Sequence, residues 1–299
     1  MERLPEELLV HVVSLTSPPD ACRAAAVSRA FRATADSDAV WSFFLPRNLP
    51  RFAKGELPCK PTSKKGLFRR LSDHPALLPH KLVSMQLDRA TGAERFTISA
   101  RALQIPRCNG LHRARACSLP NCSKEDKRFQ AVSNLMLRFF SEAAQFCRVN
   151  ELDIRAKIQR KMLSQNTTYA VYLVFKLAYV YSGFDFPHEV ASVGFAGRES
   201  TRQVCVQGYV DDVDGADSPP RKHIFQGCTG GLSRDAIPSR EEVHFPREKA
   251  DGWMEVELGE FHNEEDDDGG EVSISFMGES KSGLIVLGIE LRSKQQKPT

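Results

Sequence analysis

"KLVSMQLDRATGAERFTISARALQI", residues 81–105, is the stretch that decides what kind of fold follows the first quarter of the chain. Two short apolar runs flank Ala90-Thr91-Gly92, and the spacing of their apolar residues differs from the helical spacing seen earlier in the chain. A glycine-containing turn between two such runs is typical of an antiparallel hairpin. We therefore expect strands from about residue 80 onward.

Similar short apolar runs recur along the rest of the sequence. Amphipathic helical patterns do not separate them, which favours an antiparallel sandwich or barrel over a parallel sheet. The further predicted strands are 155–162, 168–177, 191–195, 202–209, 253–258, 272–276 and 284–292. The acidic run 264–268 lacks the alternating oxygen ligands of a calcium loop, so a solvated surface loop is favoured there.

Upstream of the hairpin, the first 46 residues have helical spacing. One helix is predicted to start near Pro5, a second to span 21–32 with Asp20 as its cap, and a third to span 38–44. A polar connector at 60–65 precedes one more helical segment at 66–72. The expected fold class is α+β and multidomain. A small all-α unit at 1–46 and a helical linker at 47–79 precede an antiparallel β-sandwich at 80–295.

Composition and charge limit the class of protein. An apolar content of 41% and a charged content of 26% are typical of globular domains. No apolar run approaches the ~20 residues that span a bilayer. Because the N-terminus also lacks the pattern of a signal peptide, we expect a cytoplasmic or nuclear protein whose eight cysteines are free thiols.

The charge is distributed unevenly. Residues 51–165 carry 23 Lys and Arg against nine Asp and Glu, whereas residues 166–299 carry 13 against 23. The basic residues are spread over more than 100 positions without the interleaved aromatic residues that single-stranded nucleic acids stack on. A solvated surface is therefore favoured, and neither a nucleic acid nor a membrane is expected as a partner.

The helical unit carries a specific motif. Leu4-Pro5-x-Glu7-Leu8-Leu9 is followed by Pro19-Asp20, by Val27-Ser28-Arg29 and by Trp41, at spacings that resemble those of an F-box. This resemblance implies docking onto the Skp-type adaptor of an SCF, cullin-based ubiquitin ligase. The residues that match positions forming or supporting the adaptor-facing surface are Leu4, Pro5, Leu8, Leu9, Pro19, Val27, Ser28 and Trp41.

The second half resembles the plant phloem-protein-2 domain, also called Nictaba-like, a lectin β-sandwich. The similar stretches include "FTISARALQI", "EVASVGFAGRESTRQVCVQGY", "ADGWMEVELGEF" and "KSGLIVLGIELR", in the family's order. Together the two resemblances identify the chain as similar to F-box phloem-protein-2-like proteins. They imply binding of oligosaccharides that contain N-acetylglucosamine or galactose.

One segment, 106–138, diverges from that pattern. The family places its sugar-stacking aromatic residues there, but no tryptophan lies between residues 42 and 252 of this chain. The remaining carbohydrate-binding candidates are Trp253 and Glu255. Trp253 has the pattern of a core strand, which is favoured over ligand contact, and Glu255 is expected to face outward.

Cys108, His112, Cys117 and Cys122 cluster inside the divergent segment. Structural zinc sites commonly pair two closely spaced ligands with a second such pair, and this cluster contains no CxxC, so zinc is not favoured. A cysteine and histidine without an orienting partner do not indicate a nucleophile. We expect no metal, cofactor or catalytic residue. A further hypothesis is that 106–138 is intron-derived or out-of-frame sequence, which sequencing of the transcript would test.

The leading hypothesis is a non-catalytic subunit of a ubiquitin ligase that recognises its targets. The F-box would dock the adaptor, and the lectin-like sandwich would bind a glycoprotein or protein. Two alternatives remain open. In one, the sandwich has lost carbohydrate binding and acts as a protein–protein module. In the other, the chain is a stand-alone lectin that binds no adaptor.

Overall fold

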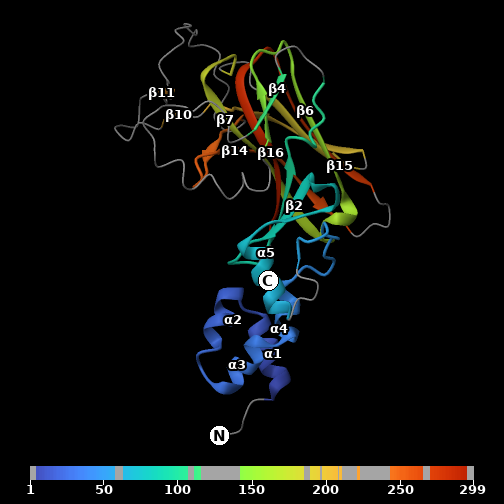
Figure 1. The fold of residues 1–299 in the computed structure, drawn as a ribbon, viewed down its shortest axis with the longest axis vertical. Helices are drawn as coiled ribbons and strands as arrows, with labels where there is room; N and C mark the ends of the chain where they lie inside the picture. Colours follow the sequence, from blue (N-terminus) through green and yellow to red (C-terminus); the bar gives the residue numbers. More distant parts are fainter. Residues whose placement is uncertain are drawn as a thin grey trace.

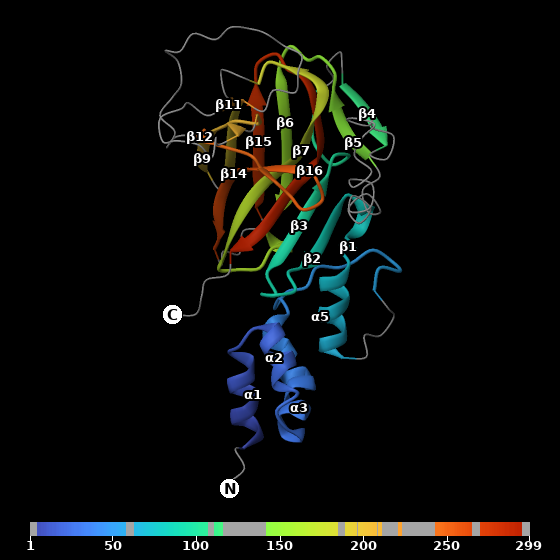
Figure 2. The ribbon, with the colours of Figure 1, turned by 90° about the vertical axis from the view of Figure 1, so that its left-hand side faces the viewer.

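The computed structural model describes residues 5–57, 63–106, 111–115, 142–184, 189–195, 197–207, 209–210, 221–222, 243–264 and 270–294. A helical unit forms one end of an elongated molecule and a β-rich unit forms the other (Figures 1 and 2). The helix α5 (Lys64–Asp73) lies between them. In the ranges given above, no helix has the length and apolar character needed to cross a bilayer.

The helical unit contains α1 (Glu6–Ser14), α2 (Pro18–Ala24), α3 (Arg29–Asp36) and α4 (Asp38–Phe44). Among the described residues, serine side chains cap four of the five α-helices, because the hydroxyls of Ser17, Ser28, Ser37 and Ser63 accept hydrogen bonds from backbone N–H groups of the first turns.

The third predicted helix, 38–44, is confirmed, but the single helix predicted over 21–32 is wrong. Ser28 adopts an extended backbone and caps a new helix, so the segment forms α2 and α3 separated by a turn. The predicted cap Asp20 is also wrong, because Ser17 caps α2 and Asp20 lies in its first turn.

The β-rich unit contains two main sheets. The larger has the order β1-β2-β3-β16-β7-β14-β13, with β4 and β5 attached beside β16, and the smaller has the order β12-β9-β8-β15-β6. Neighbouring strands are antiparallel, except that β12 pairs with β9 in parallel. A separate pair is formed by β10 and β11. The strands are β1 (Ala76–Leu77), β2 (Val83–Leu87), β3 (Glu94–Ser99), β4 (Leu111–Arg115), β5 (Glu142–Phe146), β6 (Leu152–Gln159), β7 (Thr167–Ser182), β8 (Glu189–Phe195), β9 (Arg198–Val204), β10 (Tyr209–Val210), β11 (Arg221–Lys222), β12 (Val243–His244), β13 (Arg247–Glu248), β14 (Met254–Asn263), β15 (Glu271–Gly278) and β16 (Ser282–Lys294).

These sheets confirm the α+β class with an antiparallel β-sandwich, and the hairpin predicted around Gly92 joins β2 to β3. Two predicted strands are displaced. The strand predicted at 155–162 begins earlier in the structure, at Leu152, and residues 160–162 form a 3-10 turn in place of strand. The strand predicted at 202–209 begins at Arg198 in the structure and ends at Val204.

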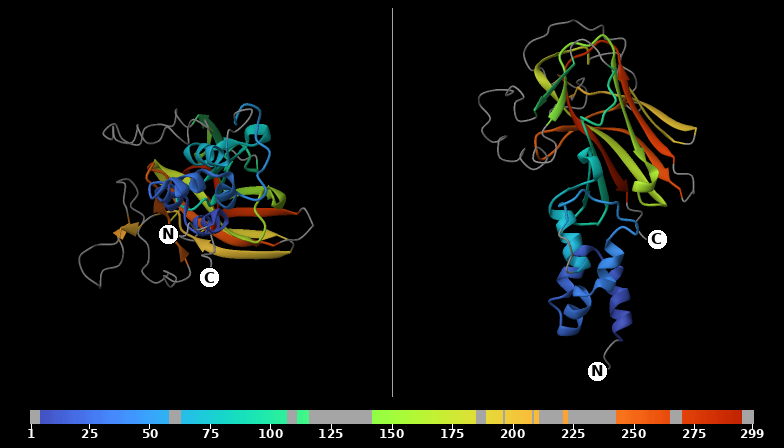
Figure 3. Two further views of the ribbon diagram at one scale, coloured as in Figure 1. Left: turned by 90° about the horizontal axis from the view of Figure 1, so that it is seen from below. Right: turned by 45° about the vertical axis from the view of Figure 1, so that its right-hand side comes forward.

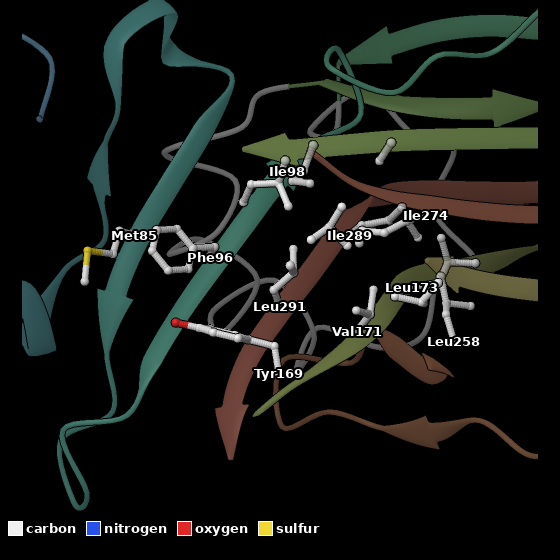
Figure 4. Close-up of a cluster of buried hydrophobic side chains, with 14 of the residues drawn as sticks. Met85, Phe96, Ile98, Tyr169, Val171, Leu173, Leu258, Ile274, Ile289 and Leu291 are labelled. Atoms are coloured by element: carbon white, nitrogen blue, oxygen red, sulfur yellow. The ribbon is translucent and has the colours of Figure 1, made fainter. Parts of the chain in front are cut away.

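The two sheets enclose one hydrophobic core. Alternate residues of β7, β14 and β16 point inward, and Figure 4 shows Val171, Leu173, Leu258 and Ile289 meeting Ile274 of the smaller sheet. This follows from the period of two in a strand, which places every second side chain on the same face.

The same core continues into the helical end of the molecule. Met85 and Phe96 of the β2–β3 hairpin belong to the cluster that also contains Phe68 of α5 and Trp41 of α4. The sandwich and the helical unit are therefore joined through packed side chains. The right-hand view of Figure 3 shows the two units one after the other along the length of the molecule.

Candidate functional sites

The first candidate site is an exposed apolar stripe on α1. Leu9 and Val13 are buried against the helical unit, whereas Leu8, Val12 and Leu15 are 51%, 55% and 65% exposed. The exposed three lie four and then three residues apart, which places them on the same side of the helix. A soluble helix normally turns its apolar residues toward a core, so a second, uncovered apolar face is typical of a binding surface.

The residues matched to the F-box motif separate into two groups. Pro5, Leu8, Val27 and Ser28 are exposed and Pro19 is partly buried, whereas Leu9 and Trp41 are buried, and Leu4 lies outside the described residues. Leu9 and Trp41 can therefore support a docking surface from beneath but do not form it. Val27 is 69% exposed and adds to the apolar surface of the unit.

Trp41 anchors the helical unit to the linker helix. Its indole Nε1–H donates a hydrogen bond of 2.6 Å to the carbonyl oxygen of Ala35, which satisfies the polar atom of a side chain that is 2% exposed. The ring contacts Phe44 and Phe68, with centroids 5.5 and 5.1 Å apart. The position of Trp41 in the F-box motif is therefore explained by its packing inside the chain.

A crevice of about 500 Å³ lies where the helical unit meets the sandwich. The helical side is contributed by residues 14–18 and 43–46, and the sandwich side by residues 90–94, 164, 166–167 and 293–294. Phe43, which is 66% exposed, is one of its apolar residues. Its size falls in the range of ligand pockets, and no feature of the sequence alone predicted it.

A buried carboxyl group forms part of the sandwich wall of this crevice. Glu94 is 5% exposed and accepts hydrogen bonds from the hydroxyls of Tyr169 and Ser164, the latter at 2.8 Å. Burial raises the pKa of Glu94, although the hydrogen bonds from Tyr169 and Ser164 act in the opposite direction. The burial of Tyr169, together with the charge of Glu94, raises the pKa of the Tyr169 phenol.

Trp253, one of the carbohydrate-binding candidates, is 2% exposed. It packs with Val174, Ile285 and Leu287 in a small cluster separate from the main core, and the ammonium of Lys176 lies 4.8 Å from its ring centroid. Its Nε1–H has no hydrogen-bond acceptor among the described residues. This burial agrees with the core interpretation of Trp253, because a sugar cannot stack on a ring that is already covered.

Glu255 does not face solvent, which corrects the expectation from strand alternation. It is 4% exposed, and Arg247 Nε and Arg292 Nη1 lie 2.6 and 3.0 Å from its Oε1. Burial alone would raise the pKa of Glu255, but the hydrogen bonds and charges of Arg292 and Arg247, with the charge of Lys249, lower it to about 2. Its carboxylate is thus occupied by partners within the chain.

The same network includes groups that sequence reasoning missed. Glu290 is fully buried and binds Lys249 Nζ at 2.7 Å and Arg292 Nε at 3.0 Å. Burial opposes ionisation of Glu290, but the charges of Lys249 and Arg292 outweigh it and lower the pKa of that carboxyl. The guanidinium of Arg292 also lies 4.4 Å from the ring centroid of Tyr172. In the sequence, charged residues alternate with apolar ones in the segments that form β14 and β16. Which of these charged residues pair depends on the order of the strands in the sheet.

The cysteine and histidine cluster is largely outside the described residues. Only His112 falls within them, in the backbone of β4, whereas Cys108, Cys117 and Cys122 do not. Within the part of the chain that the structure covers, no group of three or more His, Cys, Asp or Glu side chains could hold a metal ion. The zinc alternative thus stays untested.

Comparisons with known proteins match both ends of this architecture. The profile of the family described as Phloem protein 2 matches residues 93–293, and an F-box-like profile matches residues 1–46. F-box protein PP2-B1 of Arabidopsis thaliana is 32% identical to this chain in an alignment that covers 98% of the chain and 90% of that protein. F-box protein SKIP3 of the same plant is 33% identical, over 98% of this chain and 88% of its own length.

These matches extend over both units and the linker, in the order seen in the structure. The phloem protein 2 profile covers the sandwich from β3 almost to the end of β16, and the F-box-like profile covers α1 to α4. The chain therefore belongs to the plant F-box phloem protein 2-like family, whose members join an F-box to a lectin-like domain.

Proposed function

We propose that this chain is the target-recognition subunit of an SCF-type ubiquitin ligase and has no catalytic activity of its own. The F-box would bind a Skp-type adaptor, and the sandwich would hold the target. The observation that carries the proposal is the stripe of Leu8, Val12 and Leu15, which the rest of the described chain leaves uncovered. Aliphatic anchors at helical spacing are what a partner groove receives when it binds a helix.

The test is binding to a purified Skp-type adaptor. Wild-type protein should bind, and Leu8→Asp combined with Val12→Asp should weaken binding by at least about 30-fold, because charges would replace apolar anchors at the centre of the interface. Both side chains are exposed, so the fold should tolerate the changes. Val180→Asp is the matched control, since Val180 is 69% exposed but lies on β7 of the sandwich.

If wild-type protein fails to bind the adaptor while it binds a glycan, the chain acts as a stand-alone lectin and the proposal is wrong. If the double variant binds as tightly as wild type, the stripe is not the docking surface. Circular dichroism of each variant should show that the helical content is unchanged.

The class of target is a separate part of the proposal. The lectin-like fold supports glycoprotein recognition, but both carbohydrate-binding candidates are buried, which favours a protein target. A glycan array should compare this chain with a version that carries the family's aromatic segment in place of 106–138. We expect binding by the second protein alone, and glycan binding by both would show that the divergent segment has not removed the site.

A further inference from the structure

The linker helix α5 contacts both units of the molecule. In its last turn, the carbonyl oxygen of Ser72 accepts a hydrogen bond of 3.1 Å from Gln86 Nε2 of β2. Near its middle, Phe68 packs on Trp41 of α4, with ring centroids 5.1 Å apart. Its first turn reaches α3 and α4 through polar contacts. The helix is therefore a strut between the sandwich and the helical unit, in the position that Figure 2 shows.

Two lysines make the polar contacts of the first turn. Lys65 Nζ lies 2.6 Å from Asp36 Oδ1. The backbone N–H of Lys64 donates a hydrogen bond of 2.7 Å to Asp38 Oδ1, and Lys64 Nζ donates one of 2.6 Å to Ser42 Oγ. Asp36 is the last residue of α3, whereas Asp38 and Ser42 belong to α4. These contacts therefore tie α5 to two helices of the helical unit.

Lys65 and Asp36 each lie at the unfavourable end of their own helix. The partial positive charge at a helix N-terminus favours acidic side chains, and the partial negative charge at the C-terminus favours basic ones. The first turn of α5 nevertheless contains two lysines and no acid, and the last turn of α3 contains Asp36 and no basic residue. Neither charge stabilises its own helix, so the contact between the helices is what offsets the local cost. Such departures from local preference are expected at residues with a role beyond their own element.

These polar contacts lie at the opposite end of α4 from its contact with the hairpin. A Cβ added at Gly92 of the hairpin turn would lie 2.9 Å from the carbonyl oxygen of Phe44, which ends α4. Asp38 begins that helix, about 9 Å away at a rise of about 1.5 Å per residue. A helix held at one point can pivot, whereas a helix held at two separated points keeps its direction. The polar contacts therefore restrict a rotation that the contact at Phe44 alone would allow.

We propose that Asp36, Asp38, Lys64 and Lys65 form a polar latch that fixes the angle between the helical unit and the sandwich. Two units of one chain are otherwise expected to move relative to each other unless a large apolar interface joins them. The side chains of Lys65 and Asp36 are 33% and 53% exposed, so their charges can be changed without disturbing the core. The latch would fix the orientation of the two units whichever partners they bind, so the proposal does not depend on the proposed function.

The test exchanges the charges of the pair formed by Lys65 and Asp36. Lys65→Glu places an acid beside Asp36 and should open the latch, although an acid in the first turn favours the helix itself. Lys65→Glu combined with Asp36→Lys restores opposite charges and should close it again. Arg69→Glu is the matched control, because Arg69 is 80% exposed and its ion pair with Asp73, at 4.0 Å, lies within α5.

The angle is measured as the distance between nitroxide labels on two exposed cysteines, Cys22 of α2 and Cys147 of the sandwich, by pulsed electron spin resonance. Cys205 is buried and is kept. The cysteines to be replaced by serine are Cys59, Cys108, Cys117, Cys122 and Cys228. We expect a narrow distribution of distances in this background and a broader, shifted one in Lys65→Glu. The charge exchange and Arg69→Glu should both give the narrow distribution.

Hydrogen exchange provides a second readout, because the amide of Lys64 is bound to Asp38. Its exchange should be faster in Lys65→Glu and should slow again in the charge exchange. Circular dichroism and thermal unfolding should show that every variant is folded. An unchanged distance distribution in Lys65→Glu would mean that the apolar contacts alone fix the angle, and the proposal would be overturned. Broadening that the charge exchange does not reverse would also overturn it, since the effect would then not come from the ion pair.

Discussion

At the scale of single residues, the charge network on the large sheet makes stability depend on acidity. Glu255 has a pKa of about 2 against an ordinary value of 4.5, because Arg292 and Arg247 stabilise its charged form more than burial opposes it. A carboxyl group with a lowered pKa contributes stability that is present above its unfolded pKa. That contribution is lost as the pH falls through the folded value.

We predict that Glu255→Gln lowers the free energy of unfolding at pH 7 by roughly 3 kcal/mol. The difference from wild type should shrink between pH 4.5 and about 2, where wild-type Glu255 itself becomes protonated. Urea unfolding at a series of pH values measures this. Glu271→Gln is the control, since Glu271 makes exposed contacts, with Lys157 Nζ at 3.3 Å and with Gln159 Nε2 at 2.7 Å, and should matter by less than about 1 kcal/mol. A constant difference at all pH values would contradict the prediction.

The position of Glu255 also shows where sequence reasoning ends. Alternation along the strand correctly separates Glu255 from Val256 and Leu258, which point into the core. It says nothing about what lies on the other face. The partners of Glu255 come from β13 and β16, and their proximity depends on a sheet order that no local pattern encodes.

At the scale of elements, the turn between β2 and β3 has two roles. Gly92 completes the hairpin with a φ of +77°, and it packs against the end of α4. The sequence predicted the hairpin because a glycine between two apolar runs is a local signal. The contact with α4 was not predictable, since it joins segments almost 50 residues apart whose relative placement is set by the shared core.

We predict that Gly92→Ala destabilises the protein by more than Gly55→Ala. Both glycines have a positive φ, so each substitution should cost about 1–2 kcal/mol from the left-handed backbone. A Cβ at Gly55 meets no atom within 4 Å, whereas a Cβ at Gly92 meets the backbone of Phe44 at 2.9 Å. Urea unfolding of the two variants measures the difference. Equal losses of stability would show that the turn is not pressed against α4.

At the scale of the whole molecule, the helical unit and the sandwich behave as parts of one packed body. In the sequence, a linker separates the F-box motif from the strand-rich half. The structure places the linker helix α5 inside the packing, with Phe68 and Leu71 buried in the core that includes both Trp41 and Met85. A chain packed in this way should unfold as a unit.

The two tryptophans of the chain allow this to be tested, because Trp41 lies in the helical unit and Trp253 in the sandwich. In Trp253→Phe, the remaining indole reports on the junction between α4 and α5, while far-ultraviolet circular dichroism reports chiefly on the sheets. We predict coincident urea midpoints for the two signals, because loss of the shared core removes support from both units. Phe68→Leu, which weakens the contact with Trp41, should move both transitions together to lower urea. A Trp41 transition that precedes the loss of the sheets would mean that the F-box is an independent domain, and would contradict the prediction.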